Sequence, residues 1–374
     1  MTGAMNNIPL VDLKAQYFSI KGEIDAAIQE VINKTDFIGG SALKKFEADF
    51  AAAIGVKNCI GVGNGTDALY VALRALGVGK GDEVLVPANT FIATSEAVTL
   101  TGAKVVFVDV DEKTYNISPK LAMEKITPAT KAIMAVHLYG NPADISALRA
   151  FADSRGIFIV EDAAQAHLAK IDGRYIGSLG HAACFSFYPG KNLGAYGDAG
   201  AVVTNDDALG KKIRMLANHG RMDKYNHEIE GINSRLDGLQ AAILGTKLKH
   251  LADWTAARRR IAQTYGKLLD RKLFTLPEET PGNEHVYHLY VIRFKARDAL
   301  LNALKEKGIG AGVHYPIPLP RLKAYEYLNH KAGDFPVSER LSMEILSLPI
   351  YPELSDETVA HIARQCNEAG AKLA

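Results

Sequence analysis

Short apolar segments alternate with amphipathic helical patterns between residues 59 and 218, and this alternation constrains the fold more than any other feature of the sequence. It predicts strands at residues 59–62, 83–86, 105–108, 133–136, 157–160, 183–187 and 201–204. It predicts helices at residues 67–76, 95–101, 119–126, 144–154 and 207–218. Strands that alternate with helices form a mostly parallel sheet covered by helices on both faces. We therefore expect an α/β fold.

The two ends of the chain predict further helices around this α/β core. Residues 8–34 predict one helix after a short lead-in, and Ser41 can cap a second helix that ends at Gly55. A long helical pattern at residues 235–267 predicts a bridge to a smaller C-terminal domain. That domain is expected to hold a strand at 286–294 and helices at 299–307, 338–346 and 355–371. We expect a large domain over residues 1–250 and a small α/β domain over 251–374.

The composition is that of an ordinary soluble enzyme and argues against several classes of partner. The chain has 374 residues, 48% hydrophobic and 23% charged, with a net charge of +1. A balanced charge favours neither nucleic acid nor an anionic membrane. Cys59, Cys184 and Cys366 show no paired spacing, which argues against a zinc site or a disulfide framework and fits the cytoplasm. The opening MTGAMNN resembles no signal peptide, so we expect none.

Lys191 is the single lysine of the glycine-rich segment 184–206 and follows an apolar run at residues 182–188. An amine beside a buried strand loses hydration, so we expect its pKa to fall. A lysine that is neutral near pH 7 is a nucleophile toward carbonyl groups. Most lysines are solvated surface charges, however, and Lys191 acquires a chemical meaning only together with the segments described next.

Asp162 follows the predicted strand at residues 157–160, at the end of the strand where open α/β sheets bind ligands. A lysine together with an aspartate that faces a pyridinium nitrogen is the pair that holds pyridoxal phosphate (PLP). The aspartate keeps the ring nitrogen protonated, so that the ring can accept electrons from a substrate carbanion. The alternative for Asp162 is a helix cap after the strand.

The turn GNGT at residues 63–66 links a predicted strand to a predicted helix and is typical of a phosphate site. Free N–H groups and the helix dipole at such a position both favour an anion. No GKS or GKT follows, so the turn is not a Walker loop. The turn matches the dinucleotide-binding fingerprint GxGxxG only loosely. If the fingerprint begins at Gly61, Thr66 takes the place of its third glycine. If it begins at Gly63, Ala68 takes that place and is compatible with it. A simple capped turn also remains open.

Seven segments, taken in chain order, resemble one known family. They are NGTDAL, PANTFIAT, VHLYGNPAD, VEDAAQAH, FSFYPGKNLGAYGDAGA, GINSRLDGLQAA and HYPIPL. The chain resembles the PLP-dependent sugar aminotransferases of the DegT/DnrJ/StrS group along nearly its whole length. This resemblance implies fold type I, the aspartate aminotransferase-like fold, with PLP as cofactor and pyridoxamine phosphate as its aminated intermediate.

The resemblance also implies the roles of individual residues. It makes Lys191 the Schiff-base lysine and general base, and Asp162 the partner of the ring nitrogen. The cofactor-binding residues that it implies are Gly65, Thr66, Phe91, Asp162, Gln165, Ser186, Lys191 and Asn233, and the substrate-binding residues are Tyr188, His314 and Tyr315. His167 receives at most a supporting role. Asn233 is expected to reach the phosphate of a partner subunit, which implies a homodimer with shared active sites.

The resemblance finally implies a reaction. The segment GKNLG at residues 190–194, followed by Asp198, is typical of relatives that aminate C3 of 3-keto sugar nucleotides. We expect L-glutamate to be the amino donor and a thymidine-diphosphate (dTDP) 3-keto-6-deoxyhexose to be the acceptor. The alternatives are a C4-keto or uridine-diphosphate (UDP) sugar, and a non-catalytic regulatory protein. Pro320 stands where the family often has a histidine. Sugar dehydratases of the family have another residue in place of the Schiff-base lysine, whereas this chain keeps it as Lys191.

Overall fold

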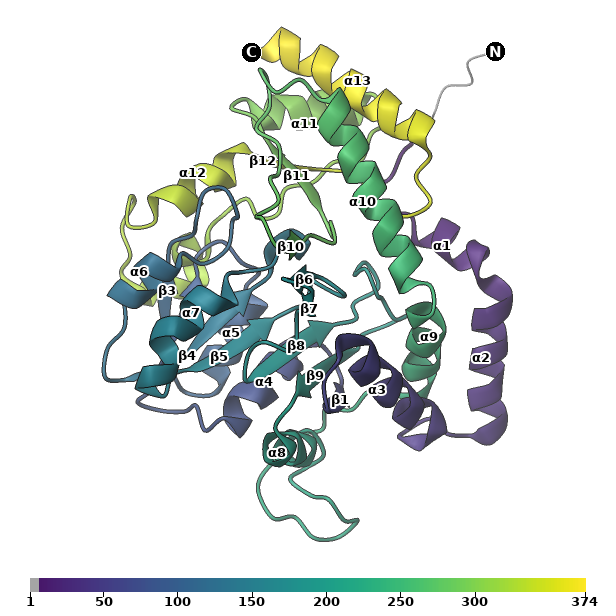
Figure 1. Ribbon diagram of the computed structural model, residues 1–374, viewed down its shortest axis with the longest axis vertical. Helices are drawn as coiled ribbons and strands as arrows, with labels where there is room; N and C mark the ends of the chain where they lie inside the picture. The colour runs from purple at the N-terminus through teal and green to yellow at the C-terminus, as the bar shows by residue number, and fades with distance from the viewer. Residues whose placement is uncertain (1–6) are drawn as a thin grey trace.

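The computed structural model describes residues 7–374 and places a seven-stranded sheet at the centre of the protein (Figure 1). The strand order is β1-β9-β8-β5-β4-β2-β3. Both neighbours of β9 are antiparallel to it and every other neighbouring pair is parallel, so the sheet is mostly parallel, as predicted. The strands span Asn58–Val62 (β1), Glu83–Pro87 (β2), Lys104–Val108 (β3), Thr130–Val136 (β4), Phe158–Asp162 (β5), Ala182–Ser186 (β8) and Gly200–Thr204 (β9).

Helices cover both faces of this sheet, which confirms the expected three layers. One face carries α4 (Gly65–Ala75), α5 (Ala93–Leu100) and α8 (Asp207–Ala217). The other carries α3 (Gly40–Ile54), α6 (Pro119–Glu124), α7 (Ile145–Ala152) and α9 (Gly238–Leu248). Side chains of β4 alternate between the two cores, with Ile133 and Ala135 in one and Ala132 and Met134 in the other. A strand that is buried on both faces reads as a continuous apolar run, which is why these strands stand out in the sequence.

The N-terminal region departs from its prediction in two details. Residues 8–34 form two helices, α1 (Leu13–Ser19) and α2 (Lys21–Lys34), which meet at Ile20, rather than one. Ser41 does not cap α3, because Gly39 is the cap residue and Ser41 lies inside the helix with its N–H directed to Asp36. Helix α2 packs against α9 through Ile24 and Ile243.

The helical pattern at residues 235–267 forms two helices, α9 and α10 (Leu251–Leu268), separated at Lys249 and His250. The predicted strand at 286–294 is shorter, β11 (Tyr290–Arg293), and it pairs with β12 (Ile345–Leu348), the first residues of which the sequence pattern predicts as helix. The remaining C-terminal helices are α11 (Arg297–Glu306), α12 (Pro336–Glu344) and α13 (Asp356–Leu373). Helices α10, α11 and α13 lie together at the top of Figure 1.

Two short segments connect the C-terminal region to the sheet. A three-stranded ribbon joins β10 (Asn283–Glu284) to β6 (Lys170–Ile171) and β7 (Arg174–Tyr175). The short helices η3 (Leu319–Arg321) and η4 (Lys323–Leu328) bring Leu319 and Tyr325 into the core under α4 and α5. The division into residues 1–250 and 251–374 stays a prediction.

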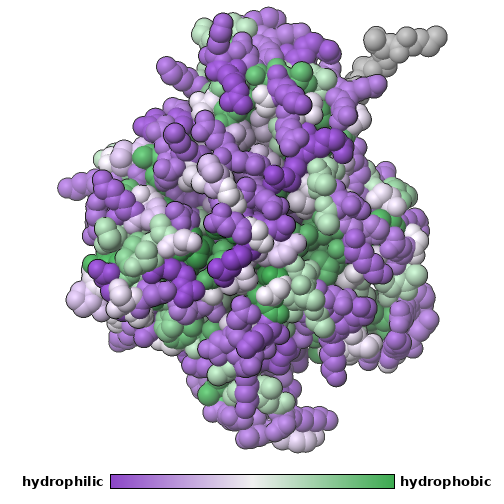
Figure 2. All heavy atoms as spheres, in the orientation of Figure 1, coloured by the Kyte–Doolittle hydropathy of each residue, from purple (hydrophilic) through white to green (hydrophobic). Residues whose placement is uncertain are grey.

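Figure 2 shows hydrophilic side chains over the top and bottom of one face, and apolar side chains gathered across its middle. None of the helices within residues 7–374 combines the length and the apolar character needed to cross a membrane. The prediction for MTGAMNN falls almost wholly on residues 1–6, which lie outside the described residues.

Candidate active site

A cavity of about 650 Å³ opens where α4 and the ends of β5 and β8 meet. It brings together most of the residues predicted from the sequence, although they are far apart along the chain. Those that line it are Gly65, Thr66, Phe91, Asp162, Gln165, Ser186, Tyr188, Lys191 and Tyr315. Within residues 7–374, Lys191 is the one cationic side chain of the lining, which also holds the carboxyl groups of Asp67, Asp162 and Asp198.

Lys191 lies on a tight loop that follows β8. Its own N–H donates to Tyr188 O (2.8 Å), and the N–H of Ala195 donates to Phe187 O (2.8 Å), which closes the loop around it. Burial lowers the pKa of the Lys191 amine to about 8, against the opposing effect of Asp162. At pH 7 about 10% of such an amine is neutral, compared with about 0.03% at the ordinary lysine pKa. The predicted fall in the pKa is therefore confirmed.

Asp162 ends β5 with its carboxylate directed into the same cavity. One carboxylate oxygen accepts a hydrogen bond from the Thr94 hydroxyl (2.8 Å), and the other accepts from the Ala164 N–H (3.2 Å). No helix follows, so the alternative of a helix cap is wrong. Burial raises the pKa of Asp162, while Thr94, Ala164 and Lys191 oppose this shift. A cation bound beside Asp162 would therefore favour its ionised form.

The GNGT turn forms the N-terminus of α4 and supports the predicted phosphate site. Asn64 caps the helix by accepting from the Asp67 N–H (2.8 Å), and the first intrahelical bond runs from the Ala68 N–H to Asn64 O (3.1 Å). The N–H groups of Gly65 and Thr66 therefore precede the helical ladder and can donate to an anion. A Cβ at Gly65 would come within 2.6 Å of the Ser186 Cβ, so only glycine allows this approach of the turn to β8.

Phe91, Tyr315 and Gln165 provide one wall of the cavity. The Phe91 side chain is 53% exposed, and its ring lies 5.5 Å from that of Tyr315 with a tilt of 39°. Gln165 is held by the Tyr139 N–H, which donates to its Oε1 (2.6 Å), so that its amide nitrogen faces the Tyr315 hydroxyl (3.3 Å). An exposed ring at the mouth of a cavity and an oriented amide are suited to an aromatic ligand with polar substituents.

Three of the singled-out residues do not line the cavity. His314 directs its Nδ1 to the Ser347 hydroxyl (2.8 Å), on the side of β12. Asn233 is exposed, whereas its neighbour Ser234 braces the phosphate turn by bonding the Gly63 N–H (2.9 Å) and Asp67 (2.6 Å). The ring of His167 is buried against Phe185 and Phe187, in agreement with a supporting role.

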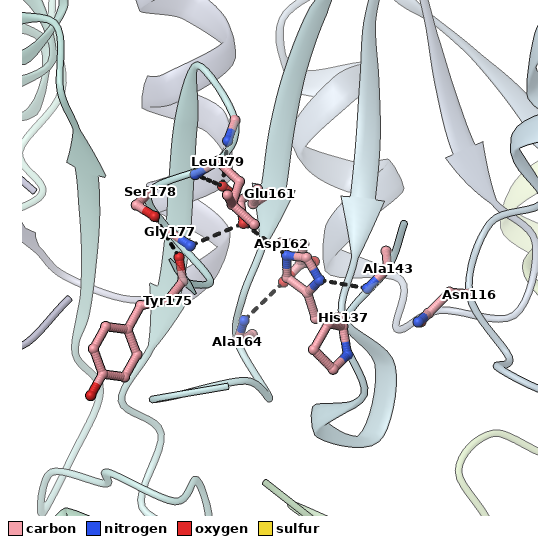
Figure 3. Close-up of polar contacts among 12 residues, drawn as sticks. Asn116, His137, Ala143, Glu161, Asp162, Ala164, Tyr175, Gly177, Ser178 and Leu179 are labelled. Atoms are coloured by element: carbon pink, nitrogen blue, oxygen red, sulfur yellow. Dashed lines mark hydrogen bonds and ion pairs between the residues drawn. The ribbon is translucent and has the colours of Figure 1, made fainter. Parts of the chain in front are cut away.

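Glu161 and His137 form a buried network behind the cavity that the sequence motifs do not reveal (Figure 3). The two oxygens of Glu161 accept from the N–H groups of Gly177 (2.9 Å), Leu179 (3.1 Å) and Gly180 (2.6 Å). His137 accepts at Nδ1 from the Ala143 N–H (2.9 Å), so its proton is on Nε2, which donates to Glu161 (3.0 Å).

The signal for this network was the strand alternation itself. Adjacent residues of a strand point to opposite faces, so an aspartate directed into the site requires Glu161 to point away from it. Burial raises the pKa of Glu161, but its hydrogen bonds from His137 and the backbone outweigh this effect, and the net shift is downward.

Replacing Glu161 with glutamine is expected to reduce the free energy of unfolding at pH 7 by about 2–5 kcal/mol, because the amide NH₂ must face donors that are left without acceptors. The folded pKa of Glu161 is lowered, so its contribution is complete above the unfolded value of 4.5 and is lost as the pH falls through the folded value. The difference in denaturant midpoint between the two proteins should therefore shrink below pH 4.5. The exposed Glu124 gives a matched control, Glu124→Gln. Equal midpoints for Glu161→Gln and the control at pH 7 would contradict this account.

Comparison with known proteins places the chain in a family. Residues 19–367 match the DegT/DnrJ/EryC1/StrS aminotransferase family. The chain belongs to this family. The match covers the phosphate turn, Asp162 and Lys191, and the resemblance noted in the sequence is confirmed.

Similar proteins carry both regulatory and enzymatic names. A protein of Geobacillus stearothermophilus named a pleiotropic regulatory protein is 47% identical, covering 97% of this chain and 98% of the relative. The UDP-N-acetyl-3-dehydro-alpha-D-glucosamine 3-aminotransferase of Acidithiobacillus ferrooxidans is 46% identical, over 95% and 96%. The dTDP-3-amino-3,4,6-trideoxy-alpha-D-glucose transaminase of Streptomyces venezuelae is 46% identical, over 93% and 92%.

A solved structure agrees with the fold in detail. The crystal structure of DesV from S. venezuelae, in complex with a ketimine intermediate, superposes with a TM-score of 0.96 at 44% identity and covers 98% of this chain and 99% of DesV. The predicted fold type I architecture is thereby confirmed. The cavity also fits PLP, because it offers an amine, a buried carboxylate, a helix N-terminus and an exposed ring. The chain is a PLP-dependent aminotransferase of the sugar aminotransferase family.

Proposed function

We propose that this enzyme transfers an amino group from L-glutamate to the C3 keto group of a dTDP-linked 3-keto-6-deoxyhexose. The observation that carries the catalytic part is the single cavity that holds Lys191, Asp162 and the turn at Gly65. The acceptor is supported by the names of two relatives at 46% identity, both of which specify a nitrogen at C3. The segment GKNLG around Lys191, with Asp198 beyond it, supports the same position.

Lys191 and Asp162 would have different roles in the reaction. PLP, when bound, supplies an electron sink for the carbon that loses its proton. Lys191 would anchor the cofactor covalently and, once released, move the proton between the substrate carbon and the cofactor. Asp162, oriented by Thr94 and Ala164, would hold the ring nitrogen in its protonated form.

The other predicted site residues would bind and orient. Gly65, Thr66 and Ser186 would hold the phosphate. Phe91 would stack on the ring, and Gln165 would contact the ring hydroxyl through the amide that now faces Tyr315. Tyr188 and Tyr315 line the cavity and would contact substrate. His314 does not line the cavity, and it would support Tyr315, its neighbour in the chain. The presence of Lys191, Asp162 and the turn at Gly65 in one cavity favours catalysis over a purely regulatory role.

Incubation with L-glutamate and matched dTDP-linked 3-keto and 4-keto 6-deoxyhexoses, followed by NMR of the product, tests the acceptor. We expect the amino group at C3 and turnover of the 3-keto substrate, because the orientation of the sugar over the cofactor decides which carbon reacts. Amination at C4 with the 3-keto compound untouched would overturn the assignment. A UDP-linked 3-keto sugar in the same assay tests the nucleotide, and faster turnover of that compound would replace dTDP by UDP.

We further propose that the active unit is a homodimer. The cavity lining carries three carboxyl groups and one amine within the described chain, a balance unsuited to the phosphate of PLP and to a nucleotide diphosphate. Additional positive or polar groups are therefore expected from a second copy. The segment at residues 219–231, which projects below α8 in Figure 1, holds Arg221, Lys224 and the 83% exposed Tyr225, and Asn233 follows it.

Mixing two inactive variants tests this shared site. Lys191→Ala removes the anchor, and Asn233→Asp places a negative charge where a phosphate is expected. In a mixed dimer one site combines the intact Lys191 of one subunit with the intact Asn233 of the other. Random mixing in equal amounts should therefore restore about a quarter of the wild-type activity per subunit. No recovery, or full activity of a monomer at low concentration, would rule the shared site out.

We also propose that the enzyme is cytoplasmic. Cys59, Cys184 and Cys366 are all buried as free thiols, in agreement with a reducing compartment. Cys184 packs in the core beside α4.

A further inference from the structure

Helix α9 contacts the loop that carries Lys191 through two side chains. We define the Lys191 loop as residues 187–197. Gln240 accepts the Tyr196 N–H at its Oε1 (2.8 Å), and its Nε2 lies 3.4 Å from Tyr196 O. Lys247, two turns further along α9, donates from Nζ to Gly194 O (2.7 Å). Residues seven apart lie on the same face of a helix, so both side chains meet the loop from one side.

Lys247 is an unusual residue at this place. Its side chain is completely buried, and its amine lies 4.2 Å from the centre of the Tyr196 ring. Within the described residues the Lys247 amine makes no ion pair. The carboxylate of Glu353 raises the pKa of this amine and so partly opposes the effect of burial, but it makes no hydrogen bond to it. An apolar side chain of the same length would fill the position without that desolvation penalty. The hydrogen bond to Gly194 and the contact with Tyr196 are what the amine adds.

The part of the Lys191 loop that follows Lys191 is closely packed. Leu193 and Ala195 are fully buried, and a Cβ at Gly194 would lie 2.2 Å from Pro189 O, so the chain is folded closely back on itself. On the opposite side Asn192 bonds Val286 O (3.2 Å) and His288 (3.2 Å). The backbone that carries Lys191 is therefore held between Asn192 on one side and α9 on the other.

We propose that Lys247 is a positioning residue that, together with Gln240, fixes the Lys191 loop so that the Lys191 amine points into the cavity. This inference rests on the proposed role of Lys191. Lys247 is not among the residues that line the cavity, so it would act through Gly194 and Tyr196. The amine of Lys247 supplies a hydrogen bond that an apolar side chain cannot replace.

Hydrogen exchange of the 374-residue chain, with and without PLP, tests whether Lys247 fixes the Lys191 loop. In Lys247→Met, amides of the Lys191 loop should exchange about tenfold faster, since one charge-assisted hydrogen bond is lost, while exchange in β4 and β5 stays as in the wild type. The exposed Lys249, two residues along, provides the control Lys249→Met. Gln240→Leu removes the second contact at a less buried position and serves if Lys247→Met does not fold.

The effect of Lys247 on catalysis is measured with the enzyme that carries PLP. Lys247→Met should lower kcat about tenfold with the KM for the amino donor within about twofold, and it should weaken the circular dichroism of the bound cofactor. Lys247→Arg, which retains a donor, should recover part of both. Loop exchange equal to that of the control would overturn the proposal, and so would faster exchange spread evenly over the whole chain. Because the exchange measurement needs no substrate, failure of the proposed function would leave the geometric result intact.

Discussion

Replacing Lys191 with alanine is expected to lower turnover by about 10⁵-fold, because a single residue would serve both as covalent anchor and as proton carrier. Within residues 7–374 of one subunit no second amine lines the cavity, so no neighbour in the same chain can take over either task. The loss should appear in kcat rather than in folding, since the change removes a desolvated amine from a partly buried site. Steady-state assays with glutamate and the keto sugar measure it.

The exposed Lys211 on α8 provides the matched control, Lys211→Ala, which should retain wild-type activity. Equal thermal midpoints for the two variants would show that the loss is chemical. A Lys191→Ala protein with turnover near that of the control would refute the assignment of this lysine.

Replacing Asp162 with asparagine should lower kcat by about 10²–10³-fold, the usual cost of removing one electrostatic stabiliser from an active site. Asparagine preserves the shape of the side chain: its oxygen can still accept from the Ala164 N–H, and its NH₂ group then faces the Thr94 hydroxyl, which can turn to accept. What it cannot do is stabilise a protonated ring nitrogen by charge. The position of Asp162, 6% exposed at the end of β5, makes that charge effective because little water screens it.

The measurement for Asp162→Asn is kcat together with the absorption spectrum of the loaded protein. Glu96→Gln, an exposed change on α5 close to the position of Thr94, is the control. Unchanged kcat in Asp162→Asn would mean that the charge of Asp162 does not keep the ring nitrogen protonated, and the interpretation of the cavity would have to change.

Much of the fold was predictable because strands buried on both faces are conspicuous in a sequence. Residues 133–136 read as one apolar run since both Ile133 and Met134 face cores. The break at Lys249 was not predictable, because residues on both sides suit a helix and the separation follows from packing, with α9 against α3 and α10 against α13. Strand β12 was missed because a short apolar run does not by itself distinguish strand from helix, and pairing with β11 decides it.

In the candidate site, too, some residues are predictable from a local sequence pattern and others are recognised only from the fold. Lys191, Asp162 and the turn at Gly65 each carry a local pattern from which the sequence predicts a site, and the fold brings the three into one cavity. Thr94, which orients Asp162, lies 68 positions away from it, and only the fold brings the two together. Lys247 likewise reads as an ordinary lysine near the end of a helix until its contact with Gly194 is seen.

The most direct test of the account is the location of the covalent link between PLP and the chain. Borohydride reduction of the loaded enzyme, followed by proteolysis and mass spectrometry, identifies the modified lysine. Burial lowers the pKa of both Lys191 and Lys247 to about 8, so amine basicity alone does not distinguish them. The geometry does, because Lys191 lines the cavity while the amine of Lys247 is bound to Gly194 O. We predict modification at Lys191; modification at Lys247 or at any other lysine would contradict the central claim.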